Sequence, residues 1–139
     1  MKKILPILII ALVVFSGCLK RKESFLVGKW ENVQRVADPV YMHIWAFKDN
    51  NTFEVESFEY LEDGSIGESV NLSVGEYTLK KKNFEFRLTL EYTEGSPLNY
   101  YNVEGEYWVE ELDRDLLKIT REDAPGDQHP FLRLEFIRV

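Results

Sequence analysis

Few residues of this sequence have the type and spacing that catalysis or metal binding requires. The chain has one cysteine, Cys18, and two histidines that do not form a metal-ligand spacing such as His-Glu-x-x-His. His43 lies in a predicted strand among aromatic residues and His129 in a predicted loop, so neither is expected to act as a ligand or base. The 24 acidic residues are dispersed, and no serine lies in a nucleophile elbow. We therefore expect no enzymatic activity, no metal site and no cofactor.

Cys18 has the clearest chemical role, because of the sequence that precedes it. Two lysines near the N-terminus are followed by an apolar run over residues 4–15 and by the small residues Ser16 and Gly17. A positive start, an apolar stretch and small residues are the three parts of an export signal. The apolar run is shorter than the roughly 20 residues that cross a membrane as a helix, and an uncleaved membrane anchor is the alternative. A single cysteine cannot form an internal disulfide, whereas an attachment role explains its presence.

Residues 15–18 resemble the lipobox of prokaryotic lipoproteins, with Phe15 at the position where leucine is usual. In those proteins the cysteine is lipid-modified and becomes the mature N-terminus. The resemblance implies a signal peptide over 1–17, lipidation of Cys18 and a tether over 18–25. It also implies attachment to the exported side of the cell membrane or of the outer membrane, and several acyl chains make such an attachment stable where one is marginal.

The mature part of the chain is acidic. Without Lys2 and Lys3, the 17 basic residues of the chain become 15 against 24 acidic ones, a net charge of −9. Nucleic-acid binding needs clustered cations that neutralise phosphates, so nucleic acid is excluded as a partner. A small basic cluster over residues 20–22 either contacts anionic lipid headgroups or belongs to a solvated tether.

After the tether, apolar and polar residues alternate in short runs separated by turn-forming clusters. This pattern is typical of half-buried antiparallel strands. Asparagine in the predicted turns at 49–51 and 81–83 tolerates left-handed dihedral angles. One run places five apolar residues on a single face, namely Phe84, Phe86, Leu88, Leu90 and Tyr92. The alternation predicts eight strands, over 26–36, 41–48, 52–60, 69–79, 83–92, 99–111, 115–121 and 131–138.

Eight strands joined mainly by short hairpins form an up-and-down meander, and closing the sheet removes its two exposed edges. We therefore predict one all-β domain over residues 26–139, an eight-stranded antiparallel up-and-down β-barrel. The interior of such a barrel is either filled by side chains or holds one small ligand. A transmembrane barrel would need a continuous lipid-facing apolar band, but the residues that alternate with Phe84, Phe86 and Leu88 are charged.

Gly28-Lys29-Trp30 opens the first predicted strand and resembles the Gly-x-Trp motif of the lipocalins and the wider calycin group. The segments FKDNNTFEVE and GEYTL are similar to those of small bacterial lipocalin-like domains. The resemblance implies that Trp30 closes the base of the barrel against an arginine of the last strand. Arg138 shares a face with the apolar residues of that strand, whereas Arg133 alternates with them. We therefore expect Gly28, Trp30 and Arg138 to be structural, with a cation–π contact between the last two.

Aromatic residues make up 14% of the chain and combine flat apolar contact with polar tips. They either line a pocket or fill the barrel, and the sequence leaves both open. Asn32 and Gln34 share a face with Trp30, so polar groups point inward, where a ligand or ordered water would satisfy them. A break in the alternation of the third strand predicts a bulge near Ser57. The candidate ligand-binding residues are Trp45, Tyr92, Tyr101, Tyr107, Asn32 and Gln34.

These features favour a lipid-anchored envelope lipoprotein whose lipocalin-like barrel binds a small apolar or amphipathic ligand. The alternative is an envelope interaction or structural module. In that case the barrel is filled by side chains, and its loops or outer face contact a protein partner. An internal cavity of roughly 300 Å³ or more would favour ligand binding.

Overall fold

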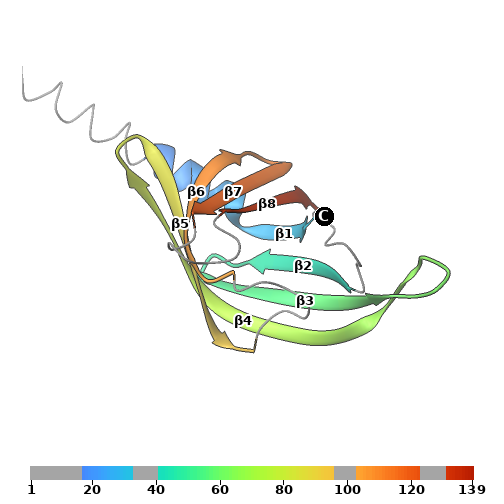
Figure 1. Ribbon diagram of the computed structural model, residues 1–139. Helices are drawn as coiled ribbons and strands as arrows, with labels where there is room; N and C mark the ends of the chain where they lie inside the picture. The colour runs from blue at the N-terminus through green and yellow to red at the C-terminus, as the bar shows by residue number, and fades with distance from the viewer. Residues whose placement is uncertain (1–16, 33–40, 96–102, 123–130) are drawn as a thin grey trace, which may run out of the picture.

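The period-two alternation of the sequence gives a sheet that closes on itself. The computed structural model describes residues 17–32, 41–95, 103–122 and 131–139. Eight antiparallel strands follow one another around a closed barrel, and β1 pairs with β8 to complete the ring (Figure 1). The predicted architecture is therefore confirmed. The strands are β1 (Gly28–Asn32), β2 (Tyr41–Phe47), β3 (Thr52–Tyr60), β4 (Ile66–Lys82), β5 (Glu85–Glu94), β6 (Gly105–Leu112), β7 (Leu116–Glu122) and β8 (Phe131–Arg138).

The strand boundaries differ from the predicted ones mainly at the start of the barrel and in β4. Residues 17–26 are helical, so the segment expected as a tether over 18–25 is a helix and β1 begins only at Gly28. The sequence analysis does not predict this helix. Strand β4 extends three residues beyond the predicted range at each end, because tight turns close both of its hairpins. The predicted strand segments 33–36 and 99–102 lie outside the described residues.

The turn between β4 and β5 corrects the predicted position of Phe84. Lys82 pairs with Glu85, so only Asn83 and Phe84 form the turn, with φ angles of 51° and 69°. Phe84 therefore does not continue the apolar face of β5, and its side chain is 86% exposed. Two-residue hairpin turns with positive φ at both positions match the twist of the strands, which is why the hairpin closes there.

Two local predictions are confirmed. The pairing of β3 with β4 shifts register between Ser57 and Phe58, where the sequence predicts a bulge. Asn51 and Asn83 adopt positive φ angles of 63° and 51°, as the two asparagine turns predict. The bulge bends the far half of the β3–β4 hairpin, and the asparagine turns allow neighbouring strands to be joined by few residues.

The barrel has two different ends. At the end that we call the base, strands are joined by the tight turns 48–51, 83–84 and 113–115, and the helical residues 17–26 lie beside it. Figure 1 shows this helical segment, in blue, next to the turn between β4 and β5. The opposite end, which we call the loop end, carries the turn 61–65 and the three longer connections between β1 and β2, β5 and β6, and β7 and β8.

One arginine holds the base together. The register of β1 and β8 places Trp30 opposite Arg138, whose guanidinium lies 4.1 Å from the centroid of the buried Trp30 ring. Arg138 also donates hydrogen bonds to the carbonyl oxygens of Phe25, Val27 (3.0 Å) and Arg114. The first two lie at the C-terminal end of the helical segment, where carbonyl groups lack helical partners. Arg138 therefore joins the helix, β1 and β8 to the turn between β6 and β7.

Trp30 and Gly28 complete this closure. The Trp30 Nε1 donates to the Leu26 carbonyl at 2.8 Å, so the ring fixes the end of the helix from the other side. Gly28 has a φ of 141°, and a Cβ at this position would lie 2.0 Å from a guanidinium nitrogen of Arg138. Only glycine leaves room for the arginine there. The structure thus brings Gly28, Trp30 and Arg138 into one contact, with Arg138 and not Arg133 against the tryptophan.

Arg138→Ala should lower the free energy of unfolding by about 2–3 kcal/mol, because it removes a buried cation–π contact and leaves carbonyl groups without a donor. Arg133→Ala is the matched control on the opposite face of β8. Arg133 is 41% exposed and pairs with Glu110 (2.9 Å) and Glu135 (3.4 Å). Exposed ion pairs contribute little, so we expect a loss of about 0.5 kcal/mol. Urea unfolding of both variants measures the difference, and equal losses would contradict this account of the base.

Candidate ligand-binding site

The antiparallel register sorts the inward side chains of β1 to β4 into rows at different depths. Nearest the base, Phe47 lies between Gly28 and Phe53, and Gly75 follows Phe53. The next row comprises Trp30, Trp45, Val55 and Ser73. In the next row toward the loop end, His43 pairs with Ser57 and Ser57 with Asn71. Asn32 follows Glu31, the partner of Ile44, so it lies beside His43 in the same row.

Aromatic rings fill the two rows nearer the base and form the floor of the interior. Trp45 stacks on Phe53 with a centroid distance of 5.6 Å and an interplanar angle of 13°. It also contacts Phe136 edge-on at 5.4 Å, and Phe53 contacts Tyr92 at 5.4 Å. Trp45, Phe53 and Phe136 are fully buried. A Cβ on Gly75 would lie 2.4 Å from the Phe53 ring, so this glycine leaves the space in which the ring sits. The base half of the barrel is therefore packed with side chains.

The row above this floor is entirely polar. His43 is 7% exposed and Ser57 is fully buried, while Asn32 and Asn71 are half-buried. Asn71 donates to the Ser73 hydroxyl at 3.2 Å. Among the residues that the structure describes, the buried Ser57 Oγ has no hydrogen-bond partner. A buried hydroxyl without a partner is costly, so a ligand group or a water molecule is expected beside it.

The described part of the facing wall, from β5 to β8, is mostly apolar, and it carries the Arg121 guanidinium near the loop end. The inward residues of β8 near this level are Leu132 and Leu134, which pack on the core. Arg121, at the loop end of β7, lies over the Tyr107 ring with its guanidinium 5.4 Å from the centroid. It also donates to the Glu104 carbonyl oxygen. The interior near the loop end thus has a polar wall, an apolar wall and a guanidinium, which suits a small amphipathic molecule.

The structure brings together part of the predicted ligand-binding set. Trp45 belongs to the floor, Tyr92 contacts the floor through Phe53, and Asn32 lies in the polar row. Tyr107 is fully buried, and its hydroxyl donates to the Val103 carbonyl oxygen at 2.6 Å, which gives it a structural bond.

Gln34 and Tyr101, the other two predicted residues, lie outside the described residues.

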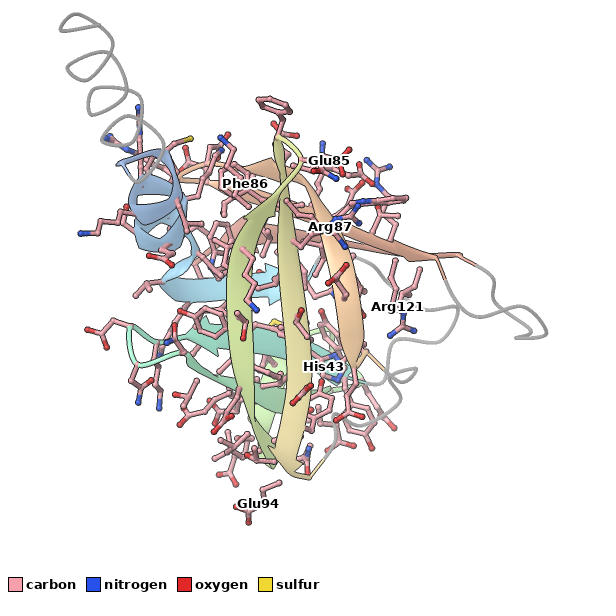
Figure 2. The ribbon with its side chains drawn as sticks, turned by 90° about the vertical axis from the view of Figure 1, so that its left-hand side faces the viewer. His43, Glu85, Phe86, Arg87, Glu94 and Arg121 are labelled. Atoms are coloured by element: carbon pink, nitrogen blue, oxygen red, sulfur yellow. The ribbon has the colours of Figure 1, made fainter. Side chains whose placement is uncertain are left out.

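The sequence analysis missed four polar residues of this interior. His43 is one of them, because it was expected only as a strand residue, although it is spaced two residues from Trp45 and so shares its face. Arg121 follows the buried residues Leu117 and Ile119 at the same spacing. Ser57 lies beside the bulge that the sequence predicted, but its burial depends on the register of β3. Asn71 can be assigned to this interior only from the pairing of β3 with β4, which places it opposite Ser57. Figure 2 shows His43 and Arg121 away from the helical segment, toward the loop end.

A hollow lies on the surface of the barrel at the base, beside the helical segment. This groove of about 420 Å³ is bordered by Glu23 of the helical segment, by Asn50 and Asn51 of the β2–β3 turn, and by both outward and buried residues of β4 and outward residues of β5. Burial raises the pKa of the neighbouring Tyr77 hydroxyl, and the carboxylates of Glu23 and Asp49 raise it further. No metal-binding cluster of His, Cys, Asp or Glu occurs among the described residues, and no described helix has the length and apolar character to cross a membrane. The interior polar row is the better candidate site.

Replacement of the two buried serines should separate a binding hydroxyl from a structural one. Ser57→Ala should leave the free energy of unfolding unchanged or raise it by up to about 1 kcal/mol, because it removes a hydroxyl that the protein leaves without a partner. Ser73→Ala removes the hydroxyl that accepts a hydrogen bond from Asn71, and it should lower the free energy of unfolding by about 1 kcal/mol. Urea unfolding measures both. A clear loss in Ser57→Ala would mean that the hydroxyl is satisfied within the protein.

Comparisons with known proteins add no assignment to this site. No protein-family model matches the chain, and comparisons with curated proteins and with solved structures give no significant match. The resemblance to the lipocalins therefore depends on Gly28, Trp30 and Arg138 and on the barrel itself. The function has to be argued from the side chains that the register brings together inside the loop end.

Proposed function

We propose that this protein is a lipid-anchored lipoprotein of the cell envelope whose lipocalin-like barrel binds a small amphipathic ligand at its loop end. The observation that carries the binding proposal is the polar row of Asn32, His43, Ser57 and Asn71 above the aromatic floor. A barrel that served only as a solid scaffold would be more stable with apolar residues at these four positions. The buried and unpartnered Ser57 Oγ is the clearest sign that the row serves another group.

The two walls of the interior define the chemical class of the ligand. The polar row offers hydrogen-bond donors and acceptors, since hydroxyl and amide groups provide both. The facing Leu132 and Leu134, together with the aromatic floor, offer apolar contact. A molecule with an uncharged hydrogen-bonding group and an apolar body would satisfy both walls.

The anchor proposal depends on Cys18. Its thiol is exposed and free, and it lies near the start of the helical segment rather than inside the barrel. No bond to the rest of the described protein would have to be broken for a lipid to be attached there. Lipidation would attach the protein to the exported side of the cell membrane or of the outer membrane.

The binding proposal can be tested by native mass spectrometry of the lipidated full chain, released from detergent in the gas phase. We expect the wild type to carry a small molecule of defined mass, and the fraction that carries it to fall about tenfold in Ser57→Val, because one hydrogen bond contributes about 1.4 kcal/mol. Glu56→Val is the matched control, since Glu56 is the neighbouring outward residue of β3. An empty wild-type barrel, or equal losses in both variants, would contradict the proposal.

The anchor has its own test. Cys18→Ser should abolish fatty-acid labelling and should move the protein from the detergent phase to the aqueous phase, because several acyl chains account for stable anchoring. Mass spectrometry of the N-terminal peptide identifies the lipid directly. A Cys18→Ser protein that remains in the detergent phase would indicate an uncleaved membrane anchor instead.

The alternative function, an envelope interaction module, is favoured by a different surface. Leu61, Ile66, Val70 and Leu72 of the β3–β4 hairpin are 46–53% exposed. Exposed apolar residues gathered on one element are typical of contact with a protein partner. Native mass spectrometry separates the two functions. An empty barrel that crosslinks to a second protein through this hairpin supports the interaction module, and a bound small molecule supports the binding protein.

A further inference from the structure

The lysines of the described residues are concentrated toward the base. All eight lysines that follow Cys18 lie in the described residues of the base half, namely Lys20, Lys22, Lys29, Lys48, Lys80, Lys81, Lys82 and Lys118. The hairpin at the opposite end carries Glu59, Glu62, Asp63 and Glu68. The described lysines and the acidic β3–β4 hairpin therefore lie at opposite ends of the barrel, although the chain as a whole is acidic.

Two basic segments that are distant in sequence lie side by side at this base. One is residues 20–22 of the helix, and the other is residues 80–82 at the end of β4. Lys22 connects them, because its Nζ lies 6.0 Å from the centroid of the Phe86 ring and donates to the Leu112 carbonyl oxygen at 2.5 Å. Both figures show the helix next to the β4–β5 hairpin, and Figure 2 places Glu85 and Phe86 at the same end as the helix. We call these two segments and Phe84 the basic tip.

Phe84 is the residue of the basic tip that folding does not explain. It occupies the second position of a two-residue turn with a φ of 69°, a conformation that favours glycine and strains a bulky residue. Its ring is 86% exposed, and the Lys81 Nζ lies 6.0 Å from the ring centroid. Strain and apolar exposure at one residue indicate a role outside the folded chain.

We propose that the basic tip rests on a bilayer surface that contains anionic phospholipids, with Phe84 inserted at the boundary between headgroups and acyl chains. This inference rests on the proposed lipid anchor, because Cys18 lies in the same helix as residues 20–22. Clustered lysines near a membrane are attracted by anionic headgroups, and apolar side chains among them enter the boundary region. The acidic β3–β4 hairpin is repelled by the same surface. The anchor, the cations and the repulsion therefore all orient the loop end away from the lipid.

The orientation can be measured with spin labels on the lipidated full chain in vesicles of phosphatidylcholine and phosphatidylglycerol at about 7:3. Cys18 is the only cysteine, so once it is acylated an introduced cysteine is the only thiol. Phe84→Cys carries the label at the basic tip, and Glu62→Cys is the control in the exposed turn at the other end. We expect collisions with an aqueous nickel chelate to be at least about threefold rarer for the label at position 84 than for that at position 62. Equal accessibility would overturn the proposal.

The role of charge is tested by a triple variant on the same labelled protein. Lys80→Gln, Lys81→Gln and Lys82→Gln together should raise the nickel accessibility at position 84 toward that at position 62. Lys29→Gln, Lys48→Gln and Lys118→Gln, which remove the same charge from residues outside the basic tip, should not. Vesicles of phosphatidylcholine alone, or 0.5 M salt, should act like the first triple variant, because salt screens exposed charges. An unchanged accessibility at position 84 under all these conditions would contradict an anionic-lipid contact.

The role of Phe84 is tested by Phe84→Gly. Glycine relieves the strained φ, so we expect the melting temperature to rise by about 2–4 °C; a fall would mean that Phe84 serves the turn and would overturn its assignment to the membrane. The tests also separate this inference from the anchor. Mass spectrometry of the N-terminal peptide is performed first, and a missing lipid contradicts the anchor and the inference together. A lipidated protein with two equally aqueous labels contradicts the inference alone.

Discussion

The closure of the sheet between β1 and β8 depends on Arg138. Strand β1 has only five residues and pairs with β8 over a short stretch. The backbone hydrogen bonds of this pairing alone therefore contribute little to closing the barrel. Arg138 adds a contact with the Trp30 ring and bonds to carbonyl groups of the helix and of the β6–β7 turn. The guanidinium suits this role because it donates in several directions from one plane and stacks on an aromatic face at the same time. Without the pairing of β1 with β8 the barrel would be open, and its inward residues would have no fixed position along the barrel axis.

Once this pairing is fixed, the antiparallel register determines what each level of the interior contains. The two rows nearer the base are aromatic or apolar except for Ser73, and the next row is polar on four successive strands. Packing alone does not explain this change from apolar to polar residues, because apolar side chains at positions 43 and 57 would extend the core. In the proposed function, the aromatic floor and the Arg138 closure provide the stability that offsets the cost of a polar row. The proposal thus assigns stability to the base of the barrel and ligand binding to its loop end.

The sequence predicted the barrel well because its signals are local. Alternation, asparagine turns and the break near Ser57 each depend on a few neighbouring residues, and parity distinguishes Arg138 from Arg133 within one strand. The polar row could not be predicted in the same way. Its members come from four strands, and only the register shows that Asn32, His43, Ser57 and Asn71 share one level. The helical residues 17–26 were missed because Arg138, which donates to the carbonyl groups at their C-terminal end, lies at the other end of the chain. Phe84 was assigned to the strand because the alternation of apolar and polar residues in β5 continues into the turn that precedes it.

The helix changes what a lipid on Cys18 would do. An extended tether would let the barrel rotate freely and would place its opening at any distance from the membrane that the chain allows. A helix fixed to the barrel by Arg138, Trp30 and Lys22 instead transmits the position of its first residues to the whole barrel. Strand β3 has nine residues, and at about 3.3 Å per residue with the usual tilt its far end lies on the order of 20 Å from the base. In the proposed orientation the polar row therefore opens toward the aqueous side. A ligand would reach it from solution or from a protein partner, not by lateral diffusion from the bilayer that holds the anchor.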